Sequence, residues 1–380
     1  MEILSPPVAH DATVTEQPGS RSQFGHRLSD AVDILTKEDP ALAAVLYDAH
    51  ARQENRLRLT PEATLTDPSV AASQALAAFC DETMGDRVER LALDRARTLF
   101  GAPLARLVTR SPAETMASLA DGPVIAVTDD PFIGAEDVLA QAQDADHRTL
   151  AVTISPSPRA PDFERWRQIA DKLEARLIVD TTGTTRLVAA GLQPSPLPHV
   201  DVWVTALGEA TLILTSDPVE VPGDHPNGAS AACLLALAAG KDYRTVTVEA
   251  VANARELAGE LRTLGWTLAT DGTDTTVVAP FLDGEADATA VQEALAAIGV
   301  HVGAHGPLLL IGTLAVTQQG FRAGEMRRLA ALLTETRRTL TDPRLIDFAR
   351  RSGRETVRRL VGEFPVPRRS LAIQRPDEFS

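Results

Sequence analysis

The sequence predicts an α/β protein with a mostly parallel sheet, followed by a smaller α+β domain. Short apolar segments at 123–130, 148–155 and 176–180 predict strands; the first is expected to be buried, and the last ends in an acid, Asp180. Segments with helical periodicity, 136–145 and 162–175, separate them. Strands that alternate with helices form parallel sheets covered on both faces, with ligands bound beyond the carboxyl ends of the strands.

The chain before this alternation is helical. Residues 1–24 lack periodicity and predict a flexible N-terminal tail. Apolar residues between Arg27 and Glu54 recur at helical spacing with an interruption near Pro40, which predicts two helices. A further amphipathic helix is expected at 89–102, with Gly101 as its C-cap.

After the sheet segments, two short strands in 201–218 are joined by a polar turn with Glu209 at its tip. The pattern then predicts helices and strands in turn: a helix at about 228–240, a helix at 248–265, a strand at 275–282, a helix at 287–299, a strand at 308–316, and helices at 323–339 and 342–362. We therefore expect a tail (1–24), a large domain with N-terminal helices (25–227) and a small C-terminal domain (228–380).

Composition limits the partners. The 380 residues carry a formal net charge of -15, so nucleic acid and anionic membrane are disfavoured partners. The two cysteines, Cys80 and Cys233, form no disulfide framework, and no ligand spacing indicates a metal. The start MEILSPPVAHD has no signal-peptide pattern, and the apolar runs are too short to span a bilayer. We expect a cytoplasmic protein.

Several stretches resemble serine hydroxymethyltransferase, a fold-type I enzyme that depends on pyridoxal phosphate (PLP). The most specific is DFERWRQIADKLEARLIVDTTGTTRLVAAGLQPSPLPHVDVWVTA at 162–206. ALDRARTLFGA, VANARELAGELRTLGWTLATDGTDTTVV, IGTLAVTQQGF and, more weakly, RQENRLRLTPEATLTDP are similar to other parts of that family. The resemblance covers most of 38–339 and implies a fold-type I aminotransferase-like large domain, a small C-terminal domain and a homodimer.

Three positions keep what the resemblance implies. Asp180 matches the aspartate that pairs with the PLP pyridine nitrogen, and Ser155 matches a serine near the cofactor's phenolic oxygen. Glu62 matches a glutamate at the folate and the substrate hydroxymethyl group, where a carboxyl can move a proton.

Other matched positions differ. Glu209 stands for the Schiff-base lysine, Gly208 for the histidine before it, and Gly183 for the ring-stacking histidine. TRSPAET replaces the phosphate loop, and its Pro112 lacks a backbone donor. Leu310 replaces the arginine that clamps the substrate carboxylate. We therefore expect no covalent PLP.

Each candidate residue also has an interpretation in which it serves the structure alone. Glu209 reads as a base facing the former cofactor cavity or as a solvated turn carboxylate, and Asp180 as a ligand group or as a cap of the following turn. Thr182 and Arg186 lie in TTGTTR, which reads as a hydroxyl-rich site for an anion or polar ligand or as a plain turn.

Two functions remain open, with a weaker third possibility that PLP or a related aromatic phosphate binds noncovalently over Asp180. The first is a PLP-independent one-carbon (hydroxymethyl or methylene) transferase that uses 5,10-methylenetetrahydrofolate and a small-molecule acceptor other than an amino acid. Glu62, Asp180 and Glu209 are its candidate catalytic residues, and Ser155, Glu62, Thr182 and Arg186 are its candidate ligand-binding residues. The second is a catalytically inactive relative that acts as a scaffold or partner subunit. Between an enzyme and a non-enzyme, the retained carboxylates favour the enzyme.

Overall fold

The computed structural model describes residues 30–78, 82–129, 148–220, 228–340 and 346–367. The chain forms two compact units, residues 1–53 and 54–380. A helix at 30–38 and helix α2 (Pro40–Glu54) are separated at Asp39, so the two predicted N-terminal helices are confirmed. The predicted tail (1–24) and the predicted helix at 136–145 lie outside the described residues.

The larger of the two sheet systems is a six-stranded sheet in the order β2-β7-β6-β5-β4-β3. Its strands are β2 (Leu104–Val108), β3 (Val124–Asp129), β4 (Thr149–Ile154), β5 (Arg176–Asp180), β6 (Val202–Leu207) and β7 (Ala210–Thr215). The pairs β3·β4, β4·β5 and β5·β6 are parallel, whereas β6·β7 and β2·β7 are antiparallel. This arrangement confirms the predicted mostly parallel sheet.

The position of a strand in this sheet explains how apolar its sequence is. Residues Leu177 to Asp180 of the central strand β5 are all buried, as expected for a strand covered on both faces. The expectation that 123–130 is a buried strand is wrong in part. It forms β3, but β3 is an edge strand with exposed and half-buried positions, and Val124 is exposed.

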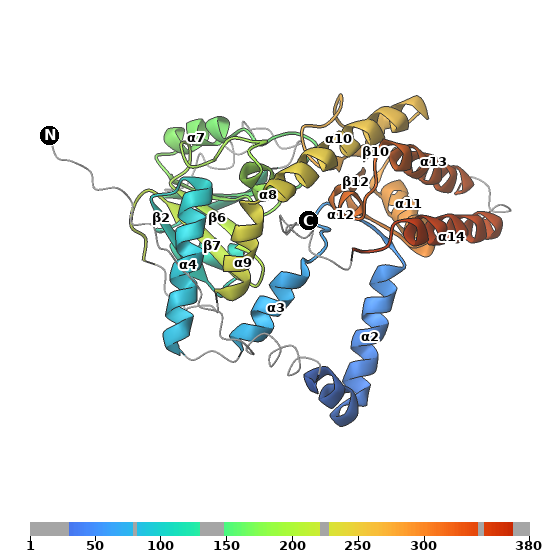
Figure 1. Cartoon of the computed structure of the whole chain (residues 1–380). Coiled ribbons are helices and arrows are strands. Elements are labelled where there is room, and N and C mark those ends of the chain that lie inside the picture. Colours follow the sequence, from blue (N-terminus) through green and yellow to red (C-terminus); the bar gives the residue numbers. More distant parts are fainter. Residues whose placement is uncertain (1–29, 79–81, 130–147, 221–227, 341–345, 368–380) are drawn as a thin grey trace, which may run out of the picture. The chain divides into compact units, whose positions relative to one another are not determined.

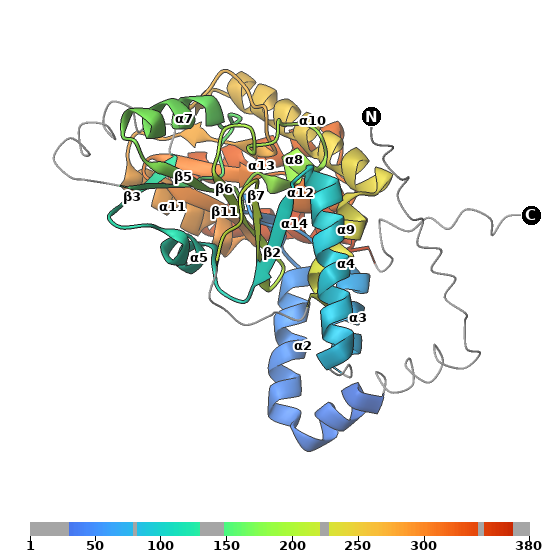
Figure 2. The ribbon, with the colours of Figure 1, turned by 90° about the vertical axis from the view of Figure 1, so that its left-hand side faces the viewer.

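Helices cover both faces of the large sheet. One apolar cluster joins it to α4 (Glu82–Phe100), α7 (Phe163–Lys172) and α9 (Ala229–Ala238). Figure 1 shows α4 and α9 side by side over β6 and β7. The opposite face packs against α5 (Pro112–Leu119) through Met116 and Leu119, and α5 lies away from α4 and α9 in Figure 2. Helix α3 (Pro68–Ala77) begins at the N-cap Asp67 and packs against α9.

A second six-stranded sheet is built mainly from the C-terminal half. Its strands are β1 (Leu57–Leu59), β8 (Thr267–Leu268), β9 (Val277–Val278), β10 (Pro280–Phe281), β11 (Val300–His305) and β12 (Leu308–Gly312). Strand β1 pairs in parallel with β11, so residues just after Glu54 complete a sheet whose other strands follow residue 266. The predicted boundaries at 24 and 227 stay predictions.

The second sheet shares one apolar core with four long helices. These are α10 (Lys241–Thr263), α11 (Glu285–Ala297), α13 (Ala323–Thr339) and α14 (Ile346–Glu363). Short helix α12 (Leu314–Gln318) follows β12 directly, so the expected strand at 308–316 is wrong beyond Gly312. The expected strand at 275–282 is divided into β9 and β10. In the described part of the chain, no helix is both long and apolar enough to cross a membrane.

Candidate functional site

The buried carboxylate of Asp180 is the centre of the candidate site. It ends β5, is 7% exposed, and its Oδ1 accepts hydrogen bonds from the backbone N–H (2.9 Å) and hydroxyl (2.6 Å) of Thr182. Burial raises the pKa of Asp180, and the two hydrogen bonds from Thr182 partly oppose this rise. Among the described residues only Oδ1 has a hydrogen-bond partner, so Oδ2 keeps its capacity to accept.

Thr182 connects this carboxylate to the next strand. Its Oγ1 accepts a hydrogen bond from the backbone N–H of Ala206, near the end of β6, at 2.9 Å. The interpretation of Asp180 as a cap of the following turn therefore agrees with the structure, because the carboxylate accepts hydrogen bonds from that turn. The same contacts hold the end of β5 and the end of β6 in one fixed arrangement.

A line of hydroxyl groups lies behind Asp180. The Thr185 hydroxyl contacts that of Thr181 at 2.8 Å and that of Thr205 at 2.7 Å. The indole N–H of Trp203 donates to the Thr181 hydroxyl. Thr181, Thr205 and Trp203 are fully buried, so these bonds satisfy the hydroxyl groups of Thr181 and Thr185 internally. The run is thus a rigid support for Asp180, and helix α8 (Thr185–Ala189) begins within it.

Glu209 lies at the tip of the β6–β7 hairpin. Leu207 pairs with Ala210, so the turn has two residues, and Gly208 takes a φ of +67° that a side chain disfavours. A Cβ at Gly208 would lie 3.2 Å from Leu234 and 3.4 Å from the Ser230 hydroxyl. Glu209 itself is exposed, and no hydrogen bond or ion pair to it is found among the described residues. The solvated-turn reading agrees with this position, and the catalytic assignment of Glu209 stays a prediction.

The loop after β4 closes another side of the site. Ser155 is half-buried, and Pro156 packs against Gly183, where an added Cβ would lie 3.3 Å from the proline ring. A large side chain at 183 therefore requires Pro156 to move. The glycine at the position of the family's stacking histidine fits this close contact.

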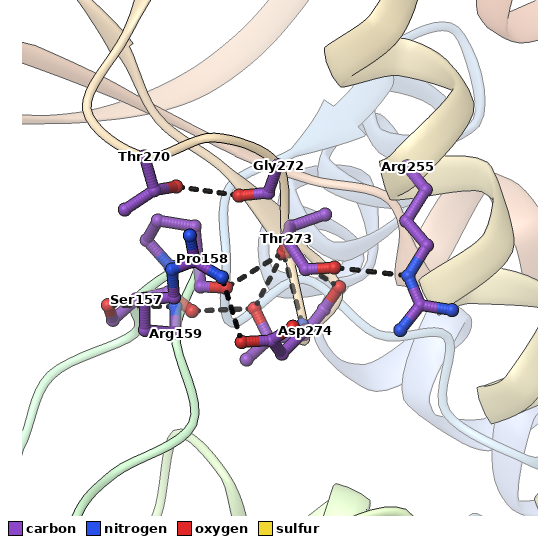
Figure 3. Close-up of polar contacts among 9 residues, drawn as sticks. Ser157, Pro158, Arg159, Arg255, Thr270, Gly272, Thr273 and Asp274 are labelled. Carbon is purple, nitrogen blue, oxygen red and sulfur yellow. Dashed lines mark hydrogen bonds and ion pairs between the residues drawn. The ribbon is translucent and has the colours of Figure 1, made fainter.

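The same loop is bound to the second sheet system through a threonine-rich turn (Figure 3). The Thr275 hydroxyl donates to the Ser157 carbonyl at 2.5 Å, and the Asp274 backbone N–H donates to the Pro158 carbonyl at 2.8 Å. Arg159 forms an ion pair with Asp274 at 3.2 Å. These contacts hold the chain next to Ser155 against the turn at 270–276.

Glu62 lies on a loop that packs tightly on β11 and β12. A Cβ at Gly312 would lie 2.5 Å from the Thr60 carbonyl oxygen and 2.9 Å from the Pro61 Cα, so only glycine permits this approach. The Ala63 backbone N–H donates to the Thr60 carbonyl at 3.0 Å, which closes the turn that carries Glu62. The Glu62 side chain is exposed. A fixed backbone thus presents a carboxylate for which the described residues provide no hydrogen-bond or ion-pair partner.

The segment in place of the phosphate loop is a capped helix start. Ser111 is the N-cap of α5, its Oγ accepts from the Glu114 backbone N–H, and Glu114 Oε2 accepts the Ser111 backbone N–H at 3.0 Å. The hydrogen bonds from Ser111 lower the pKa of Glu114, the backbone bond most. Pro112 is at the first helical position, where a backbone N–H has no partner in the helix. The side chains of Glu114 and Ser111 therefore accept the hydrogen bonds of two backbone N–H groups that would otherwise be available to an anion at this helix start.

The remaining positions lie on other elements. Leu310 is in β12 and pairs with Gly303, where an added Cβ would lie 3.3 Å from Leu310 and 3.2 Å from Pro61. Arg186 is in α8, with its guanidinium 4.2 Å from the centre of the Tyr243 ring and its Nη2 donating to the Thr64 hydroxyl at 3.5 Å. Through Thr64, the loop that carries Glu62 contacts the helix that follows Asp180.

The structure therefore brings some of the predicted residues together. Asp180 ends β5, Thr182 and Arg186 follow it, and the Glu62 loop is joined to Arg186 by Thr64. The sequence-based predictions assigned no role to Thr181, Thr185 or Tyr243. The hydroxyl-rich composition of TTGTTR was a signal for the first two, whereas nothing near Tyr243 in the sequence indicated its contact with Arg186. In the described ranges, no group of three His, Cys, Asp or Glu side chains is placed to hold a metal ion.

Amines that could hold an aldehyde cofactor are few. The sequence contains three lysines, Lys37, Lys172 and Lys241. All three lie on helices and are exposed. None of them is in the β6–β7 hairpin.

Comparison with known proteins agrees with this architecture. The serine hydroxymethyltransferase family model matches residues 124–213, which include β3 to β6 and the Asp180 turn. A serine hydroxymethyltransferase of Halorhodospira halophila is 25% identical over 86% of this chain and 97% of its own length. Serine hydroxymethyltransferase 2 of Mycobacterium bovis is 28% identical over 88% of this chain and 97% of its own. A Nostoc sp. serine hydroxymethyltransferase is 28% identical over 64% of this chain.

The mostly parallel sheet, the carboxylate at the end of β5 and the second sheet define a protein with the fold-type I α/β architecture. Over most of its length, the chain is similar to serine hydroxymethyltransferases.

Proposed function

We propose that this protein transfers a one-carbon unit from 5,10-methylenetetrahydrofolate to a small-molecule acceptor other than an amino acid, without covalently bound PLP. The observation that carries the proposal is the combination of a retained, buried Asp180 with a hairpin tip that bears Glu209. Its relatives named serine hydroxymethyltransferase support the one-carbon chemistry.

The residues fit a covalently held PLP poorly. The hairpin tip offers a carboxylate, the three lysines are exposed on helices, and the start of α5 is capped by Ser111 and Glu114. Schiff-base formation needs an amine next to the ring, and phosphate binding needs free N–H donors. Asp180 does satisfy one requirement of that cofactor, which is a carboxylate for the ring nitrogen.

The chain's groups suit a direct transfer to a nucleophilic acceptor. The folate donor supplies an electrophilic carbon at the oxidation level of formaldehyde. The acceptor would form a bond to this carbon while the two carbon–nitrogen bonds of the donor break, and water would supply the hydroxyl where the product is hydroxymethylated. Glu62 lies on a loop fixed by Gly312 and has no hydrogen-bond or ion-pair partner among the described residues, so it would pass the released protons to the folate nitrogens. Asp180 Oδ2 accepts a hydrogen bond from the acceptor and orients it, with Ser155 at the neighbouring strand end. We keep Glu209 as a further acceptor-side group and propose a homodimer.

A second candidate is a catalytically inactive scaffold or partner subunit. The exposure of both Glu62 and Glu209 favours it, since general acids and bases usually lie in enclosed surroundings. Leu310 at the position of the family's substrate arginine agrees with either function.

Thermal unfolding with added ligands separates the candidates, because a ligand that binds only the native state raises its stability. We expect 5,10-methylenetetrahydrofolate to raise the unfolding temperature and PLP to leave it unchanged. Glu62→Gln should reduce the shift, whereas Glu164→Gln, an exposed glutamate in α7, should not. No response to either ligand would favour the scaffold. A shift with PLP that survives desalting would refute the proposal.

A further inference from the structure

Arg186 is a largely enclosed cation. It lies in α8, and one face of its guanidinium is covered by the Tyr243 ring from α10, with 4.2 Å between the guanidinium carbon and the ring centre. Burial lowers the pKa of Arg186, and the nearby Tyr243 partly opposes this effect. An arginine stays charged in a protein even so, and its charge must be compensated in place.

The described residues compensate this charge only in part. Of the five N–H donors of the guanidinium, the structure gives one a hydrogen bond, from Nη2 to the Thr64 hydroxyl, and at 3.5 Å it is long. No carboxylate in the described ranges forms an ion pair with Arg186. Arg167, by contrast, pairs with both Asp171 and Asp201. An enclosed charge without a counter-ion is costly, so Arg186 has the properties of a residue that awaits an anion.

The surroundings of Arg186 are fixed by neighbouring elements. Gln318 Oε1 of α12 accepts from the Thr64 hydroxyl at 3.2 Å and from the Leu65 backbone N–H at 2.8 Å. Thr64 is therefore held as the acceptor for Arg186, and with Tyr243 it fixes the plane of the guanidinium. A planar donor set held in one orientation is suited to a carboxylate, which binds it through two parallel hydrogen bonds.

We propose that Arg186 binds the carboxylate of a small-molecule ligand of this protein. The identification of that ligand as the acceptor rests on the proposed function. The family's carboxylate-binding arginine corresponds to Leu310 in β12, so Arg186 supplies the positive charge from a different element. The single negative charge of a carboxylate is balanced by one arginine. The double charge of a phosphate would be balanced only in part by this cation, and the Glu62 carboxylate on the neighbouring loop would repel it.

The test uses the full-length protein, with sodium propionate and inorganic phosphate as probes at constant ionic strength. Thermal unfolding and calorimetric titration are compared for the wild type, Arg186→Gln and Arg244→Gln. Arg244 is an exposed arginine next to Tyr243 in α10, so its replacement removes the same charge from the same region. We expect saturable stabilisation by propionate in the wild type and in Arg244→Gln. In Arg186→Gln the dissociation constant should rise at least about tenfold, which corresponds to the loss of a charge-assisted hydrogen bond.

A second variant keeps the test decisive if Arg186→Gln does not fold. Arg186→Lys retains the charge but not the planar donor pair, and it should bind propionate more weakly than the wild type. Equal stabilisation of the wild type and the folded variant, or a wild type that responds to phosphate but not to propionate, would overturn the inference. Propionate binding at Arg186 without any response to 5,10-methylenetetrahydrofolate would contradict the proposed function alone.

Discussion

Replacement of Gly312 by alanine tests whether the Glu62 loop is held as the structure shows. The new Cβ would lie 2.5 Å from the Thr60 carbonyl oxygen, 2.9 Å from the Pro61 Cα and 3.0 Å from the Thr60 carbonyl carbon. All three are backbone atoms, so no side chain can rotate away. Gly312 has no positive φ, and the effect of alanine is therefore steric rather than conformational.

The cost follows from the displacement that alanine requires. Ordinary contact begins at 3.4 Å, so the Thr60 carbonyl must move by 3.4 minus 2.5, or about 0.9 Å. Overpacking of this kind costs about 1–3 kcal/mol, and loss of the hydrogen bond from Ala63 to Thr60 adds about 1 kcal/mol. We expect Gly312→Ala to lower the free energy of unfolding by about 2–4 kcal/mol.

Gly259→Ala is the matched control. Gly259 lies inside α10, and a Cβ added there would have no atom within 4 Å, so alanine should stabilise by about 0.5–1 kcal/mol through helix propensity. Equilibrium unfolding in urea measures both variants. The expected order of stability is Gly259→Ala, wild type, Gly312→Ala. If Gly312→Ala unfolds within about 0.5 kcal/mol of the wild type, the Thr60–Pro61 segment does not pack on β12 as described.

Two further predictions concern the ends of β5 and α5. The pKa of Asp180 is raised in the folded state, so the native state binds this proton more tightly than the unfolded chain does. The resulting stabilisation is fully present below about pH 4 and is lost as the pH rises through the raised pKa. Asp180→Asn, which keeps the acceptor for Thr182, should therefore be at least as stable as the wild type at pH 7. The difference in free energy of unfolding between this variant and the wild type should decrease towards pH 4. Urea unfolding at pH 7 and pH 4 measures it, and an increase towards pH 4 would contradict the prediction. Ser111→Ala removes the N-cap of α5 and should destabilise by about 1 kcal/mol, whereas Ser118→Ala, whose hydroxyl bonds only to its own helix, should cost less in the same assay.

Much of the large sheet could be predicted from local sequence. RLIVD gives β5 to the residue, and Asp162 followed by an amphipathic segment gives α7, because burial on both faces and helix capping leave strong local patterns. The start of α5 also has a local signal, since Ser111 and Glu114 have the spacing of a capping box, but the comparison of TRSPAET with a phosphate loop obscures it.

The elements that were missed depend on distant partners. VHVGAH forms β11 only because it pairs with β1 and β12, and its glycine interrupts the strand pattern. The residues after Gly312 turn into α12, where the Thr313 backbone N–H donates to the Thr276 carbonyl and the Thr313 hydroxyl to that of Ala250. A short apolar run does not distinguish strand from helix without such contacts.

The sequence allowed several residues of the candidate site to be predicted, but not the contacts that join them. The strand-end position of Asp180 followed from the parallel sheet. The bond from Ala206 to Thr182 and the stacking of Arg186 on Tyr243 join segments that are separate in sequence, so no spacing could indicate them.

The most direct test of the central claim is reductive trapping of PLP. The full-length protein is incubated with stoichiometric PLP, desalted, treated with borohydride and measured by mass spectrometry of the intact chain and its peptides. We predict no pyridoxyl adduct, because the hairpin tip carries Glu209 and the three lysines are exposed on helices. A stoichiometric adduct on Lys172 or Lys241, with an aldimine absorbance before reduction, would contradict that claim.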